Sequence, residues 1–138
     1  DVGCGSGILA IAASKLGAGE VIAVDYDPVA VSVAEENIRA NHVHNAAALQ
    51  SDLLAVCTGL EPAALITANI IADIIIRLFD QLDAYLAPGG VLIASGIIDD
   101  RIADVERAAA AHGYTVLDMT CEKEWAAMII RRTAELEP

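Results

Sequence analysis

Asp1-Val2-Gly3-Cys4-Gly5-Ser6-Gly7 is the stretch that decides the fold, and the other elements can be placed outward from it. Asp1-Val2 reads as the last step of a strand whose body is missing, and a helical run from Ile8 to Leu16 follows the glycines and closes on Gly17. A strand that enters a glycine-rich turn and leaves as a helix lets backbone N–H groups face a ligand closely, because no side chain blocks the approach. The pattern therefore predicts a ligand site in an α/β fold.

The glycine spacing separates two classes of enzyme. The dinucleotide fingerprint G-x-G-x-x-G requires a small residue where Ile8 stands, whereas this sequence reads G-x-G-x-G with an acid shortly before it. D-V-G-C-G-S-G resembles the first motif of Rossmann-like S-adenosylmethionine-dependent methyltransferases, in which this loop wraps the methionine part of the cofactor. The resemblance implies a set of cofactor contacts: Asp1, Gly3, Cys4, Gly5, Ser6 and Gly7. A purely structural glycine turn is the alternative.

A second acidic position follows the next predicted strand, Val21 to Val24. Asp25 stands at the end of this strand, where a carboxylate can accept hydrogen bonds from both ribose hydroxyls of an adenosine. Asp27 is the rival for this role, but the proline that follows it favours Asp27 as the N-cap of a helix. Tyr26, between the two acids, is predicted to line the adenine pocket.

The predicted third strand, Ala46 to Gln50, is the weakest. In the class that the sequence resembles, an acidic or polar residue after this strand receives the adenine amino group. The resemblance implies Asp52 for this contact, with Leu53 as its apolar neighbour. The alternative is a solvated Asp in a polar loop, and the weak strand leaves the register open by about one or two residues.

The alternation of strand and helix continues with a fourth strand at Leu65 to Ala68. The helix after it carries apolar residues at spacings of four and three, namely Ile71, Ile75, Leu78, Leu82 and Tyr85. Pro88-Gly89-Gly90 predicts a turn, Val91 to Ala94 a fifth strand, and Asp99 to His112 a further helix.

The C-terminal part departs from this alternation. Tyr114 to Cys121 and Trp125 to Arg131 are strand-like runs, and the three residues between them are too few for a helical crossover. They predict an antiparallel hairpin, with Trp125 packed in it. The tail from Thr133 to Pro138 is expected to fray.

Asn69 ends the fourth strand, at the edge where open parallel sheets bind ligands. Its carboxamide oxygen and a nearby backbone carbonyl can hold an amine with its lone pair aimed at a sulfonium methyl, so that catalysis comes mainly from orientation. Asn69 and Ile70 are therefore the candidate catalytic residues, and Asn69 is also a candidate cofactor contact. The alternative is that Asn69 caps the following helix.

Further motifs narrow the resemblance to one family. They are V-D-x-D-P at 24–28, A-x-x-N-x-x-x-N at 34–41, A-N-I at 68–70, P-G-G at 88–90, S-G-I at 95–97 and E-W at 124–125. Together they resemble the PrmA family of ribosomal protein methyltransferases over nearly the whole chain. The resemblance implies S-adenosylmethionine as cofactor and a large-subunit ribosomal protein, methylated on lysine or N-terminal amines, as substrate. It also implies an α/β fold with a doubly wound, mostly parallel seven-stranded sheet of order 3-2-1-4-5-7-6 and a C-terminal antiparallel hairpin.

Two features of the family are not found in residues 1–138: its N-terminal substrate-recognition domain and a cofactor segment ahead of the first strand. The chain is therefore interpreted as one S-adenosylmethionine-binding catalytic domain with a truncated first strand, a fragment whose substrate is recognised through the absent domain. Enzymes that methylate glutamine amides or nucleic-acid bases typically carry the motif N-P-P-Y at the end of this strand. Here Asn69 is followed by Ile70-Ile71, which counts against both of these substrates. A methyltransferase of small-molecule amines or of another protein, and a non-catalytic cofactor-binding scaffold, are the alternatives.

Charge and composition exclude several functions. The chain has 20 acidic and 8 basic residues, a formal net charge of −12, which repels phosphate backbones and disfavours direct nucleic-acid binding. The richest apolar stretch, Ala63 to Phe79, is interrupted by Asn69, Asp73 and Arg77, so no membrane span is expected and a cytoplasmic location is predicted.

The cysteines and histidines predict no metal site. Cys4, Cys57 and Cys121 are far apart, with no C-x-x-C pair, which favours free thiols in a reducing compartment. His42 and His44 lie in a polar stretch between two predicted elements.

Overall fold

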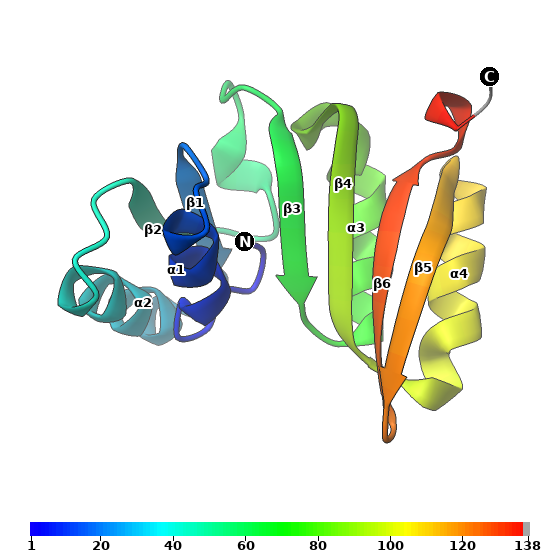
Figure 1. The fold of residues 1–138 in the computed structure, drawn as a ribbon, viewed down its shortest axis with the longest axis horizontal. Coiled ribbons are helices and arrows are strands. Elements are labelled where there is room, and N and C mark those ends of the chain that lie inside the picture. The colour runs from blue at the N-terminus through cyan, green and yellow to red at the C-terminus, as the bar shows by residue number, and fades with distance from the viewer. Residues whose placement is uncertain (137–138) are drawn as a thin grey trace. The chain divides into compact units, whose positions relative to one another are not determined.

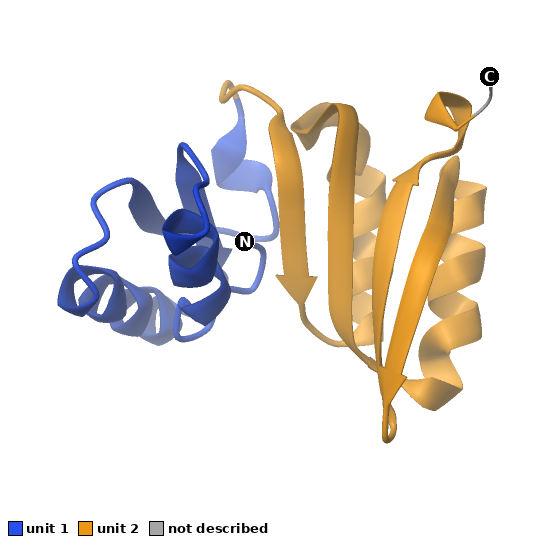
Figure 2. Cartoon of the chain, viewed as in Figure 1, with its two compact units in different colours: residues 1–58 blue, residues 59–138 orange. Residues whose placement is uncertain are grey.

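Strands and helices alternate along most of the chain in a computed structural model that describes residues 1–136. The chain divides into two units, Asp1–Thr58 and a second that begins at Gly59 (Figure 2). Each unit has its own sheet and its own helices.

The first unit is built on a pair of parallel strands (Figure 1). Its elements are α1 (Ile8–Lys15), β1 (Val21–Asp25), α2 (Pro28–Ala40), β2 (Ala46–Gln50) and the 3-10 turn η1 (Ala55–Cys57). Val2 forms a parallel bridge with Val24 of β1, so the first residues are paired as the end of a strand, as the sequence predicts. The predicted third strand coincides with β2.

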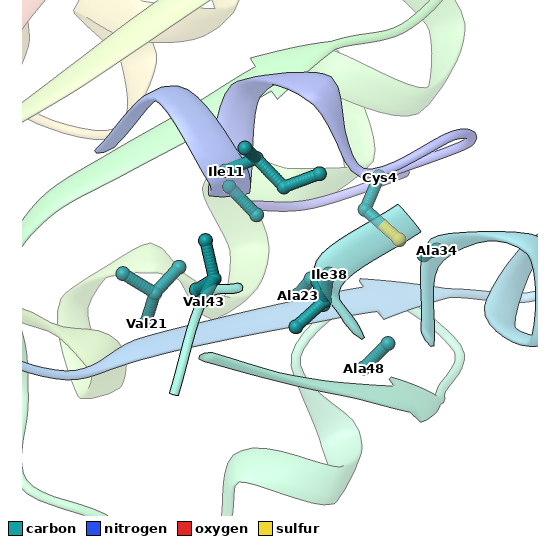
Figure 3. Close-up of a cluster of buried hydrophobic side chains, with 9 residues drawn as sticks. Cys4, Ile11, Val21, Ala23, Ala34, Ile38, Val43 and Ala48 are labelled. Carbon is teal, nitrogen blue, oxygen red and sulfur yellow. The ribbon is translucent and has the colours of Figure 1, made fainter. Parts of the chain in front are cut away.

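Small side chains form much of the core of this unit (Figure 3). Ala10, Ala23 and Ala34 are fully buried, one each from α1, β1 and α2, and they let both helices approach the same face of the strands closely. Ile11 and Ile38 fill the remaining space between helices and strands. The helices and strands of this unit alternate in the order α1-β1-α2-β2, and the glycine turn that precedes α1 lies at the end of β1.

The second unit is a four-stranded sheet in the order β3-β4-β6-β5 among the described residues. Its elements are β3 (Ala63–Asn69), α3 (Ala72–Tyr85), β4 (Leu86–Ile98), the 3-10 turn η2 (Asp99–Arg101), α4 (Ile102–Ala111), β5 (Tyr114–Glu122), β6 (Trp125–Arg132) and the 3-10 turn η3 (Thr133–Glu135). β3 and β4 are parallel, whereas β6 is antiparallel to both β4 and β5. The predicted C-terminal hairpin is therefore confirmed.

Helices α3 and α4 lie on the same face of this sheet (Figure 1). Ile75, Leu78 and Leu82 of α3 are completely buried, as the apolar spacing predicts. Ile71 is the exception: it was predicted to face inward, but it precedes the first helical residue and is 63% exposed. Trp125, predicted to pack in the hairpin, is 49% exposed.

The prediction of a turn at Pro88-Gly89-Gly90 is only partly right. Leu86 pairs with Ala63 and Val91 pairs with Leu65, so β4 advances by five residues between these two pairs while β3 advances by two. The extra residues form a bulge within one continuous strand, because the same neighbouring strand takes up the pairing again beyond it.

The prediction that the tail frays is wrong for its first residues. Thr133–Glu135 forms a 3-10 turn, the Thr133 amide donates to the carbonyl of Gly113, and the Gly89 amide donates to Oε1 of Glu135 at 3.0 Å. The carboxylate thus fastens the C-terminal turn to the bulge of β4. Residues 137–138 lie outside the described residues.

The architecture agrees with the predicted fold class in its coarse features. The described strands form mixed, mostly parallel α/β sheets, with parallel pairs β1–β2 and β3–β4 and an antiparallel C-terminal end.

Candidate functional site

The glycine-rich loop, residues 3–7, is fastened to the end of β1. The Cys4 amide donates to the carbonyl of Val24 at 2.9 Å, and the Gly5 amide donates to Oδ2 of Asp25 at 2.9 Å. The amide of Val24 in turn donates to the carbonyl of Asp1. The loop and the strand end are thus joined through both backbone and side chain, and the sequence-predicted pair Gly5 and Asp25 is brought into contact.

Asp25 holds two segments of backbone with one carboxylate. Its Oδ2 accepts from Gly5, and its Oδ1 accepts from the amide of Asp27 at 3.0 Å. A carboxylate has about four lone-pair positions, so each oxygen retains capacity for a further donor such as a ribose hydroxyl. The side chain is fixed in place before any ligand binds.

The carboxylate of Asp27 caps a helix instead of holding the glycine loop. Its Oδ1 accepts from the amide of Val29 at 2.9 Å, and it is the N-cap of α2, with Pro28 at the first helical position. The predicted capping role is confirmed. The assignment of the ribose contact to Asp25 stays a prediction.

Helix α2 packs against the glycine-rich loop and donates a hydrogen bond to it. Gly7 has φ +83°, and a Cβ placed there would lie 3.2 Å from the Cβ of Ala34. The carboxamide of Asn37 donates through Nδ2 to the carbonyl of Ser6 at 2.7 Å. Figure 3 shows Cys4 and Ala34 in the same buried cluster. Ala34 and Asn37 of the A-x-x-N-x-x-x-N motif thus hold the glycine loop, a role that was not predicted for Asn37 from the sequence.

We expect Asn37→Asp to weaken binding of the predicted cofactor, S-adenosylmethionine, about tenfold, because a carboxylate oxygen would then face the Ser6 carbonyl. Isothermal titration calorimetry on the complete gene product measures this directly. Asn41→Ala is the control, since Nδ2 of Asn41 donates to the backbone carbonyl of Asn37 at 2.8 Å, one turn further from the glycine loop on the same helix. Equal losses in the two variants would contradict a role specific to the loop.

The thiol of Cys4 is buried beside Asp25. Burial, and after it the negative charge of Asp25, raises the pKa of the Cys4 thiol above its ordinary value, so the thiol is protonated at neutral pH. Cys57 is likewise buried with a raised pKa, whereas Cys121 is exposed, and all three are free cysteines.

The predicted adenine residues lie on the loops that follow β1 and β2. The Ser51 amide donates to the carbonyl of Asp25 at 2.9 Å, which joins the segment before Asp52 to the end of β1. Leu53 is buried and has φ +52°, an uncommon conformation for a residue with a side chain. Tyr26 is 75% exposed. The adenine contacts of Tyr26, Asp52 and Leu53 stay predictions.

Asn69 is the last residue of β3 in the second unit, and Ile70 follows it. Helix α3 has Ile71 at its cap position and no side-chain cap, so the alternative that Asn69 caps this helix is wrong. The carboxamide oxygen of Asn69 instead lies against the Cα of Gly96 in β4, and the amide of Ile70 donates to the carbonyl of Ser95 at 3.2 Å. The role of Asn69 and Ile70 toward an acceptor stays a prediction.

The described part of the chain offers little else for ligand chemistry. His42 and His44 are both exposed, and within residues 1–136 no three His, Cys, Asp or Glu side chains are grouped as a metal site requires. None of the helices formed by these residues combines the length and apolar character that crossing a membrane requires.

Comparison with known proteins gives a consistent picture. Residues 1–133 match the family model described as ribosomal protein L11 methyltransferase (PrmA). The chain is similar to the ribosomal protein L11 methyltransferase of Heliobacterium modesticaldum, with 50% identity over 134 residues that cover 96% of this chain and 42% of that protein. The chain thus spans less than half the length of such curated relatives.

Solved structures resemble the chain as well. The crystal structure of ribosomal protein L11 methylase from Lactobacillus delbrueckii subsp. bulgaricus has a TM-score of 0.89 and 37% identity, covering 94% of this chain and 67% of that one. A putative tRNA (m1A22) methyltransferase from Streptococcus pneumoniae, in complex with S-adenosyl-L-methionine, has a TM-score of 0.82 and 19% identity, covering 96% of this chain and 64% of that one. The second likeness concerns the fold alone.

Proposed function

Since the chain belongs to the ribosomal protein L11 methyltransferase (PrmA) family, we propose that it is the S-adenosylmethionine-binding catalytic domain of a protein N-methyltransferase. The carboxylate of Asp25 carries this proposal, because it fixes the glycine loop through Gly5 and the following turn through Asp27 while keeping acceptor capacity for a ribose. The fold shared with a methyltransferase that binds S-adenosylmethionine supports the choice of cofactor.

The reaction is an in-line displacement at carbon. The lone pair of a neutral amine attacks the sulfonium methyl, the carbon–sulfur bond breaks, and S-adenosylhomocysteine leaves as the nitrogen gives up a proton to solvent. S-adenosylmethionine supplies the activated methyl group. The carboxamide oxygen of Asn69 and the carbonyl of Ile70 accept hydrogen bonds from the amine and direct its lone pair, so that the protein contributes orientation. Cys4, held as a neutral thiol, takes no part as a nucleophile.

The acceptor in this proposal is a lysine side chain or N-terminal amine of a large-subunit ribosomal protein, and the relatives named ribosomal protein L11 methyltransferase support a ribosomal protein as the substrate. The formal net charge of −12 attracts a basic protein and repels nucleic acid. The complete protein carries further residues for substrate recognition, in keeping with relatives about twice as long. A cytoplasmic location, without membrane attachment, accompanies this function.

The two sheets belong, in this proposal, to one seven-stranded sheet. Its order is β2, β1, the strand that ends at Asp1-Val2, β3, β4, β6 and β5, which corresponds to 3-2-1-4-5-7-6 in the usual numbering. The bridge between Val2 and Val24 and the order β3-β4-β6-β5 support it. The carboxyl ends of β1 and β2 lie at one edge of the first unit's parallel pair, and the proposal puts S-adenosylmethionine at this edge.

The test is methyl transfer by the complete gene product. The purified protein is incubated with S-adenosylmethionine and with large-subunit ribosomal proteins from cells that lack the enzyme, and intact-protein mass spectrometry reports the methyl groups added. Methylation of one ribosomal protein on amino groups is the expected result. Transfer only to small amines or to RNA would overturn the acceptor, and cofactor binding without any transfer would identify a scaffold.

A further inference from the structure

The S-G-I motif, Ser95 to Ile97, belongs to the family resemblance, and the proposed function leaves it without a role. It lies at an irregularity of β4: Ala94 pairs with Met128 and Ile97 pairs with Ala126 of β6, so the register shifts between them. Gly96, inside this bulge, has φ +75°, a conformation that side chains rarely adopt. On the other side of β4, Ser95 pairs with Asn69 at the end of β3.

The end of β3 occupies the space that a side chain at Gly96 would need. A Cβ on Gly96 would lie 2.7 Å from Oδ1 of Asn69, 3.2 Å from the carbonyl oxygen of Ile70 and 3.3 Å from its amide nitrogen. The hydrogen bond from the Ile70 amide to the Ser95 carbonyl keeps this backbone in place. A methyl group at position 96 would therefore push the carboxamide oxygen of Asn69 aside and crowd the backbone of Ile70.

We propose that Gly96 is a positioning residue for the acceptor amine: its missing side chain provides the space in which the Asn69 carboxamide and the Ile70 carbonyl are held at the end of β3. The inference rests on the proposed function, since that function gives these two oxygens to the amine. Gly96 itself touches no reacting atom and acts through its two neighbours.

Gly96→Ala in the complete protein tests this. We expect kcat for methyl transfer to fall about a hundredfold, because a displacement of about 1 Å of an orienting group has that effect. Binding of S-adenosylmethionine, measured by calorimetry, is expected to weaken less than about tenfold, since the glycine loop and Asp25 are untouched and only the predicted contact of Asn69 is displaced. A kcat close to that of the wild type would overturn the proposal.

Gly113→Ala is the matched control for backbone strain. Gly113 has φ +78°, as unusual as that of Gly96, but a Cβ there meets no atom within 4 Å. Both variants therefore impose a similar conformational cost, and only one displaces Asn69. We expect Gly113→Ala to keep the wild-type kcat, and an equal loss in both variants would show that strain alone is responsible.

Two further measurements separate the inference from the proposed function. In an Asn69→Ala background, adding Gly96→Ala is expected to lower kcat by less than about threefold, because the displaced carboxamide is already gone; a full additional loss would contradict the proposal. The side-chain amide resonance of Asn69 in ¹⁵N-labelled protein is expected to shift in Gly96→Ala and not in Gly113→Ala. An unmoved resonance overturns the inference even in an inactive protein, whereas a wild type without transferase activity overturns only the proposed function.

Discussion

Asp25→Ala is expected to weaken S-adenosylmethionine binding about a hundredfold or more in the complete protein. The substitution removes the acceptor of the Gly5 amide, the acceptor of the Asp27 amide, and the carboxylate predicted to hold the ribose. Hydrogen bonds to charged groups contribute about 1.5–3 kcal/mol each, and about 1.4 kcal/mol corresponds to a tenfold change in affinity. Loss of the ribose contacts together with a loosened loop therefore accounts for about a hundredfold loss of affinity for S-adenosylmethionine, which calorimetry can measure.

Asp27→Ala is the control for this experiment. It removes the N-cap of α2, which costs about 1 kcal/mol of stability, but leaves the carboxylate of Asp25 in place. We expect thermal unfolding at a lower temperature with S-adenosylmethionine binding largely retained. The reverse pattern, in which Asp27→Ala loses binding and Asp25→Ala keeps it, would transfer the ribose contact to Asp27.

Asn69→Ala is expected to lower kcat about a hundredfold, a larger effect than the loss of affinity for S-adenosylmethionine, about tenfold or less, that removal of one predicted cofactor contact produces. The reason is that its carboxamide orients the amine and does not cap α3, whose cap position is Ile71. Steady-state kinetics with the ribosomal protein acceptor, alongside calorimetry with the cofactor, separate the two effects. A large loss of cofactor affinity with unchanged kcat would make Asn69 a cofactor residue only.

Asn69→Asp gives a second measurement that a merely structural role would not change. A carboxylate beside the acceptor raises the pKa of the amine, because it stabilises the ammonium form. Only the neutral amine can attack, so the pH profile of kcat/KM is expected to rise at a higher pH than in the wild type. An unshifted profile would mean that the side chain at position 69 does not contact the amine.

Local patterns in the sequence predicted the elements that depend on neighbouring residues. The strand–glycine turn–helix pattern placed the loop beside Asp25, Asp27-Pro28 placed the start of α2, and the short link before Trp125 predicted the hairpin. In each case the information lies within a few residues of the chain, where periodicity and capping preferences act.

The contacts that sequence reasoning missed join segments far apart in the chain. Asn37 donates to Ser6, 31 residues earlier in the chain, the Gly89 amide donates to Glu135, and Gly96 leaves room for Asn69. Such contacts produce no period and no local signature, since a single polar or small residue serves a partner that only the tertiary fold brings near. Asn37 and Gly96 stand in motifs that carry the family resemblance, but the contacts that explain them are seen only in the folded structure.

The contrast between the cysteines has a practical consequence for following the protein in solution. Maleimides and similar reagents react with accessible thiolates, and Cys4 and Cys57 are buried with raised pKa values. Cys121, near the tip of the β5–β6 hairpin, is the exposed thiol. One fluorophore or spin label can therefore be attached to the hairpin of the native sequence, with the glycine loop left unmodified.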